Sequence, residues 1–124
     1  MRDYIHVMDV AEGHVRTLKY LLDREPQILS LNIGTGIGTS VLELINVFEE
    51  VNKVKIPYIF AERRQGDNAF VVADNSLART LLNWEPKLSL DECIELTTDW
   101  YVNYMSGEPL QRITEEQIEF YENK

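Results

Sequence analysis

Short apolar runs along the chain alternate with longer segments whose apolar residues recur every three or four positions. The short runs are typical of strands, and the periodic segments are typical of amphipathic helices. The pattern predicts strands at residues 4–7, 28–33, 56–60 and 70–73, and helices at residues 9–23, 40–52, 76–82, 90–105 and 115–121. This alternation predicts an α/β fold, with a mixed or mainly parallel sheet of three to four strands and about five helices.

Polar residues mark several of the expected helix starts. Two S-x-x-E capping boxes, Ser40–Glu43 and Ser89–Glu92, each precede an apolar periodic segment. Asp9 is expected to cap the first helix. Gly13 falls inside that helix, where glycine costs about 1 kcal/mol relative to alanine. We therefore expect another element to pack closely against Gly13.

Residues 34–39, called here the glycine turn, join the second predicted strand to its helix. The dinucleotide-binding fingerprint G-x-G-x-x-G would need glycine at position 39 after Gly34 and Gly36, and the chain has Thr39 there. No acidic residue follows about twenty positions later at a strand end. These departures disfavour a dinucleotide loop. A tight connection, or a turn that abuts a ligand held by other residues, remains open.

The composition narrows the classes of partner. The 124 residues suffice for one domain, and the net charge of −9 argues against nucleic acid and anionic membranes as partners. No apolar run approaches the length of a membrane span. Cys93 is the only cysteine, so we expect no internal disulfide, no cysteine metal cluster and a cytoplasmic location. Its apolar helical neighbours favour a core thiol over a reactive one.

Candidate catalytic groups are few. A tyrosine with a lysine four positions later would suit proton transfer in a nicotinamide enzyme, but none of the tyrosines has one. Neither histidine has a metal-binding partner nearby in sequence. We therefore predict no catalytic residue and no metal site. Arg2, at a strand start, and Arg64, in a charged loop with Asp67, are candidates for phosphate binding because the arginine fork donates two parallel hydrogen bonds. The alternative is that both arginines are solvated on an acidic surface.

Four segments carry a resemblance to a known family. They read R-D-Y-I-H-V-M-D-V-A-E-G-H at residues 2–14, N-I-G-T-G-I-G-T-S-V-L-E at residues 32–43, R-R-Q-G-D at residues 63–67 and A-D-N-S-L-A-R-T-L-L-N-W at residues 73–84. In this order and spacing they strongly resemble UDP-glucose 4-epimerases of the extended short-chain dehydrogenase/reductase group. Related nucleotide-sugar dehydratases and decarboxylases share weaker versions. The resemblance covers about residues 2–100, and the tail, residues 107–124, matches no family pattern.

The resemblance is to the C-terminal third of such an enzyme, and it implies a UDP-sugar site. The implied roles are diphosphate contacts for Arg2 and Arg64, the nucleotide pocket wall for Tyr4 and Val41, a ribose hydroxyl for Asp67, and the sugar's second carbon for Val71. Valine is smaller than the aromatic residue that some family members have there, so an N-acetyl group is expected to fit beside Val71.

The implied function is that of the substrate-binding part of an NAD-dependent epimerase in galactose and UDP-hexose metabolism. Residues 1–124 are expected to form one domain, a piece of the family's fold. The N-terminal cofactor domain, which holds NAD in the complete enzyme, would be missing, so we expect the chain alone to be inactive and to bind no NAD. Uncovered apolar faces on residues 9–23 and 28–33 predict a homodimer. The alternative is a non-catalytic binding or interaction module, a truncated relative of these enzymes.

Overall fold

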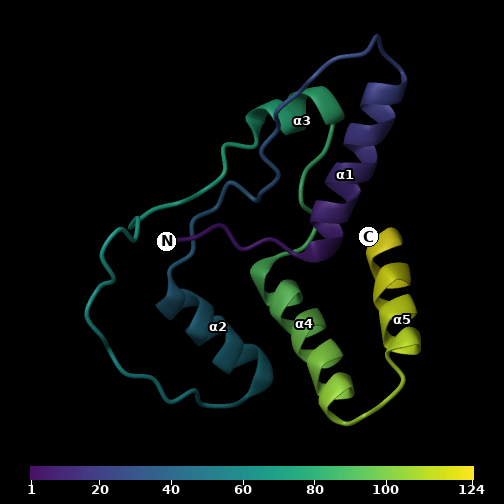
Figure 1. Ribbon diagram of the computed structural model, residues 1–124. Coiled ribbons are helices and arrows are strands. Elements are labelled where there is room, and N and C mark those ends of the chain that lie inside the picture. The colour runs from purple at the N-terminus through teal and green to yellow at the C-terminus, as the bar shows by residue number, and fades with distance from the viewer.

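Helices are the only regular elements of the chain. The computed structural model describes residues 1–124 and contains no β-strand. The helices are α1 (Val7–Leu22), α2 (Val41–Asn52), α3 (Ser76–Leu82), α4 (Leu90–Met105) and α5 (Leu110–Glu122) (Figure 1). The predicted α/β fold with a three- to four-stranded sheet is therefore wrong.

The predicted strands fail because they lack partners. A helix makes its backbone hydrogen bonds within itself, whereas a strand must find them on a neighbouring strand. Of the 59 backbone–backbone hydrogen bonds, 44 lie within the regular elements, which here are all helices. Strand-like pairing is limited to two isolated bridges, both made by Arg2. Ile28, which the pattern assigned to a buried strand, is 100% exposed, and Ile59, which it assigned to another strand, is 90% exposed.

The helix starts follow their local signals in two cases. Ser40–Glu43 and Ser89–Glu92 both form reciprocal capping boxes, as predicted, and α2 and α4 end where the pattern indicated. Asp9 is wrong as a cap, because α1 begins at Val7 and the ring of His6 accepts the hydrogen bond from the N–H of Met8 at 3.2 Å. The last helix begins at Leu110, five residues earlier than predicted.

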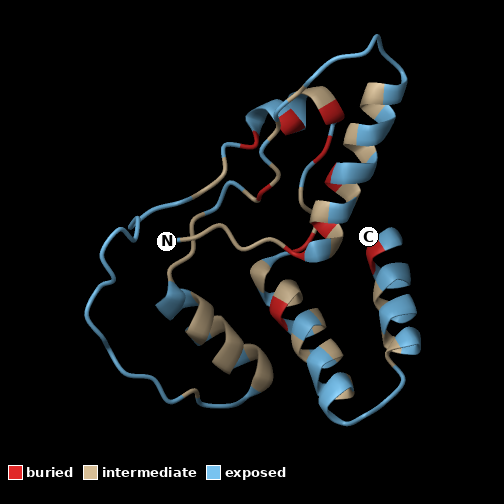
Figure 2. Ribbon diagram, in the orientation of Figure 1, coloured by how far each residue is buried: buried red, intermediate tan, exposed pale blue.

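The helices pack in three pairs. In Figure 1, α1 lies beside α3, α4 lies beside α2, and α5 folds back along α4. The buried residues concentrate where α1 and α3 meet the irregular segments around them (Figure 2). This small core consists of Ala78, Leu82 and Trp84, and partly buried Ile5, Tyr20, Leu31, Ile33 and Leu81 pack against it.

Gly13 allows a close approach in this core. A Cβ atom at position 13 would lie 3.2 Å from two side-chain carbons of Ile33 and 3.4 Å from the indole of Trp84. The close packing predicted at this glycine is therefore confirmed.

Candidate functional site

Arg2 joins three segments that lie far apart in the sequence. Its N–H donates to the carbonyl of Thr39 at 2.9 Å, and the N–H of Thr39 donates back to the carbonyl of Arg2 at 2.8 Å. On its other side Arg2 pairs in parallel with Val71, whose N–H donates to the carbonyl of Met1 at 3.1 Å. The first residues of the chain therefore lie between the glycine turn and the segment that contains Val71.

The guanidinium of Arg2 is held by oxygen atoms. Its Nη2 contacts the carboxylate of Asp67 at 2.7 Å, and its Nη1 donates to the carbonyl of Asn68 at 2.8 Å. Because both side chains of the ion pair are more than a third exposed, the pair contributes little stability, about 0–1 kcal/mol. Its effect is geometric, since it holds Arg2 against Asp67. The structure thus brings together three residues of the predicted site, Arg2, Asp67 and Val71.

The other three predicted residues are less closely connected. Arg64 accepts a backbone hydrogen bond from Asp67 at 3.3 Å, and its side chain is exposed. Val41 is the exposed first residue of α2. Tyr4 lines an open apolar cavity of about 470 Å³ between the N-terminal residues, α2 and α4. No hydrogen bond or ion pair joins these three side chains to Arg2 or Asp67.

Asp3 has a role that the sequence interpretation missed. Its carboxylate accepts hydrogen bonds from the N–H groups of Thr35 and Gly36, both at 2.9 Å, from the N–H of Ala73 at 3.2 Å, and from the Thr35 hydroxyl. Burial acts to raise the pKa of Asp3, but these hydrogen bonds together outweigh burial and lower it. The available signal was its position beside Arg2 in the first family-like segment.

The glycine turn is too closely packed to serve as a dinucleotide loop. A Cβ atom at Gly34 would lie 2.5 Å from the Cβ of Ala73 and 2.7 Å from a carboxylate oxygen of Asp3. The amides of Thr35 and Gly36, which a pyrophosphate would need, already donate to Asp3. These residues do not fit the pyrophosphate of NAD, and the turn is a tight connection into α2.

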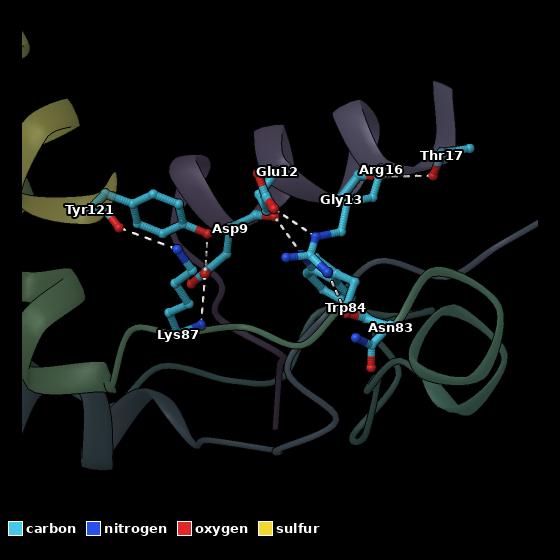
Figure 3. A network of polar contacts seen from close by, with 9 residues as sticks. All are labelled: Asp9, Glu12, Gly13, Arg16, Thr17, Asn83, Trp84, Lys87 and Tyr121. Carbon is cyan, nitrogen blue, oxygen red and sulfur yellow. Dashed lines mark hydrogen bonds and ion pairs between the residues drawn. The ribbon is translucent and has the colours of Figure 1, made fainter. Parts of the chain in front are cut away.

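A second carboxylate, Asp9, is fully buried and ties together three parts of the chain (Figure 3). It accepts hydrogen bonds from the N–H groups of Lys87 and Leu88, at 2.8 and 3.4 Å, and from the hydroxyl of Tyr121 at 2.9 Å. Its main-chain carbonyl accepts from the indole N–H of Trp84 at 3.2 Å. Burial, reinforced by this carboxylate, raises the pKa of Tyr121. Asp9 is therefore a structural link between α1, residues 84–88 and α5.

The remaining reactive groups show no catalytic pairing. Burial, together with the negative charge of Asp9, raises the pKa of the half-buried Cys93 thiol to about 11, so the thiolate is scarce at neutral pH. Burial lowers the pKa of His6 despite the opposing effect of Asp9. Histidine, cysteine and carboxylate side chains nowhere gather in a group of three or more that could bind a metal ion. None of the five helices has the length and apolar character needed to cross a membrane.

Known proteins with similar sequences include several UDP-glucose 4-epimerases. No protein-family model matches the chain. UDP-glucose 4-epimerase of Rhizobium leguminosarum bv. trifolii is 45% identical over 101 residues, which make up 82% of this chain and 31% of that enzyme. UDP-glucose 4-epimerase of Bacillus subtilis (strain 168) is 43% identical over 107 residues, or 86% of this chain and 31% of the enzyme.

A solved structure agrees with these relatives. UDP-glucose 4-epimerase from Stenotrophomonas maltophila, crystallised with bound NAD and formylated UDP-arabinopyranose, superposes with a TM-score of 0.78 at 44% identity. The match covers 85% of this chain and 31% of that structure. The chain thus spans about a third of the length of the relatives it matches. Over most of its length, the chain is therefore homologous to a part of the UDP-glucose 4-epimerases.

Proposed function

We propose that this chain is the UDP-sugar-binding part of an epimerase that acts on UDP-hexoses. The proposed site consists of Arg2, Tyr4, Val41, Arg64, Asp67 and Val71. The chain's contribution would be to hold the non-reacting UDP end of the substrate, so that binding energy from that end positions the sugar.

The observation that supports the proposal most is the meeting of Arg2 with Asp67 and Val71. These residues lie 65 and 69 positions apart in sequence, yet they are joined by a 2.7 Å ion pair and a backbone bridge. The Stenotrophomonas relative was crystallised with a UDP-sugar derivative, and a relative from Bifidobacterium longum was crystallised with UDP.

The chemistry of the site suits a nucleoside diphosphate. The Arg2 fork now donates to carboxylate and carbonyl oxygens. Arginine binds a carboxylate or a phosphate with the same two parallel N–H···O bonds, so a diphosphate can take the place of these acceptors. A diphosphate that binds the guanidinium of Arg2 would replace Asp67 as its partner. The freed carboxylate of Asp67 could then accept a hydrogen bond from a ribose hydroxyl. The exposed guanidinium of Arg64 is three residues from Asp67 and would supply the second positive charge.

Turnover would need groups from outside this chain. In the complete family enzyme NAD takes a hydride from the sugar and returns it to the other face. The glycine turn does not fit the pyrophosphate of NAD. No tyrosine is followed by lysine four positions later, a spacing that would suit proton transfer in a nicotinamide enzyme. We therefore propose that the chain alone does not interconvert UDP-glucose and UDP-galactose.

Calorimetric titration of the chain with UDP tests the binding proposal. The Arg64→Ala variant is expected to lose about 1.5–3 kcal/mol of binding free energy, the scale of a hydrogen bond to a charged group. Arg112→Ala is the matched control, because Arg112 is a similarly exposed arginine on α5 and its removal changes the net charge equally. Equal losses in the two variants would mean that only non-specific charge attraction is measured. Absence of binding by the unmodified chain would favour the non-catalytic module.

A further inference from the structure

We propose that Asp3 is the positioning residue of the UDP site, holding in register the three segments from which the site residues project. The inference rests on the proposed function for its ligand. Asp3 itself is not proposed to contact UDP; it is proposed to act through the backbone atoms that it binds.

The contacts of the Asp3 carboxylate divide between two distant segments. One oxygen accepts from the N–H and hydroxyl of Thr35, and the other accepts from the N–H of Gly36 and the N–H of Ala73. The carboxylate therefore binds the glycine turn and the segment after Val71 at the same time. Its own backbone belongs to a third segment, which begins at the N-terminus.

Each of these segments carries proposed site residues close to the contact. Arg2 and Tyr4 are the immediate neighbours of Asp3, Val71 lies two positions before Ala73, and Val41 follows the glycine turn by two residues. The backbone bridges from Arg2 to Thr39 and to Val71 join the same three segments. A shift at Asp3 would consequently move Arg2 relative to Val71 and to the start of α2.

The chemistry requires a carboxylate at this position. All four groups that face Asp3 are donors, two on each oxygen, and an ionised carboxylate offers acceptors only. Asparagine would turn an N–H₂ group toward two of these donors in either amide orientation. Asp3→Asn therefore removes hydrogen bonds while leaving the shape of the side chain nearly unchanged.

The test compares this variant with Asp9→Asn. Asp9 is a fully buried carboxylate that, like the partly buried Asp3, accepts backbone N–H groups. Its partners are Lys87, Leu88 and Tyr121, none of which is a proposed site residue. UDP affinity is measured by calorimetry. On the same proteins, hydrogen exchange of the donating amides of Arg2, Thr39 and Val71 is measured by NMR relative to the amides of α4.

Asp3→Asn is expected to weaken UDP binding about tenfold, or about 1.4 kcal/mol, and to lose the relative protection of the three amides. Asp9→Asn is expected to lower the free energy of unfolding but to keep the wild-type UDP affinity and the relative protection of the three amides. If Asp3→Asn does not fold, Thr35→Val takes its place, because it removes the hydroxyl that donates to Asp3. Thr35→Val should weaken UDP binding by less than tenfold and reduce the protection of the three amides. Thr35→Ser keeps the hydroxyl and should leave the UDP affinity and the protection unchanged.

The outcomes separate the two proposals. Wild-type affinity in Asp3→Asn, or equal affinity losses in the Asp3 and Asp9 variants, would overturn the positioning role alone. A wild-type chain that binds no UDP would overturn the proposed function. The exchange data would then decide by themselves whether Asp3 holds the three segments together, and unchanged protection in Asp3→Asn would overturn that as well.

Discussion

The hydroxyl of Tyr121 donates a 2.9 Å hydrogen bond to the carboxylate of Asp9, 112 residues away in the sequence. Both residues are buried, and Lys87 strengthens the junction by donating to the main-chain carbonyl of Tyr121 at 3.3 Å. The C-terminal tail, residues 107–124, is thereby attached to a carboxylate of the first segment that resembles the family, residues 2–14. This contact ties the end of α5 to the first turn of α1.

Tyr121→Phe is expected to destabilise the chain by about 1.5–3 kcal/mol, because it removes a hydrogen bond to a buried charged group and keeps the ring. Urea unfolding followed by circular dichroism measures the change. Tyr101→Phe is the control, since the Tyr101 side chain is exposed and its hydroxyl makes no hydrogen bond within the chain. Equal stability of the two variants would show that α5 is not held through Asp9.

Gly34→Ala is expected to destabilise the chain by about 1–3 kcal/mol, the range for overpacked sites. The added methyl group would lie 2.5 Å from the Cβ of Ala73, so the glycine turn and Ala73 must separate. Ala73→Gly removes the clashing atom and should recover part of the lost stability in the double variant. Thermal unfolding of the two single variants and the double variant measures the coupling free energy between positions 34 and 73. If the stability losses of the single variants simply add in the double variant, the two positions are not in direct contact.

Stability is expected to depend on pH through Asp3. Its pKa in the folded chain is below its ordinary value, since four hydrogen bonds outweigh the opposing effect of burial. A carboxyl with a lowered folded pKa contributes stability at pH values above its unfolded pKa of about 3.9. That contribution is lost as the pH falls through the lower, folded pKa. Urea unfolding is measured between neutral and strongly acidic pH. The free energy of unfolding should fall more steeply on acidification for the wild type than for Asp3→Asn. An equal fall in the two proteins would show that Asp3 does not contribute this pH dependence.

Self-association is our remaining proposal. Only 11 of the 124 residues are buried, and large apolar side chains such as Ile28, Ile59 and Phe60 are exposed. Covering apolar surface yields about 25 cal/mol per Å², so we expect a homodimer. Pairing through residues 28–33 as a strand edge is not the route, because these residues form no strand. Light scattering at micromolar concentration should give twice the 14.4 kDa chain mass; the mass of one chain at every dilution would contradict the proposal.

Local signals in the sequence predicted local structure correctly at two helix starts and at Gly13, although the expected cap at Asp9 was wrong. The capping boxes at Ser40–Glu43 and Ser89–Glu92 involve residues three positions apart, and both formed as predicted. The close packing at Gly13 was likewise indicated by a glycine within a helical pattern. The order and spacing of the four family-like segments were sufficient to identify the homology to UDP-glucose 4-epimerases.

Contacts between distant residues could be decided only by the tertiary structure. The Asp3 carboxylate binds groups 32 to 70 positions away, and the Asp9 carboxylate binds groups 78 to 112 positions away, so no pattern within a short window could reveal either role. The predicted sheet failed for the same physical reason. An apolar alternation describes which side chains prefer burial, whereas a strand exists only where a second backbone accepts its hydrogen bonds, and here such pairing is limited to the bridges at Arg2.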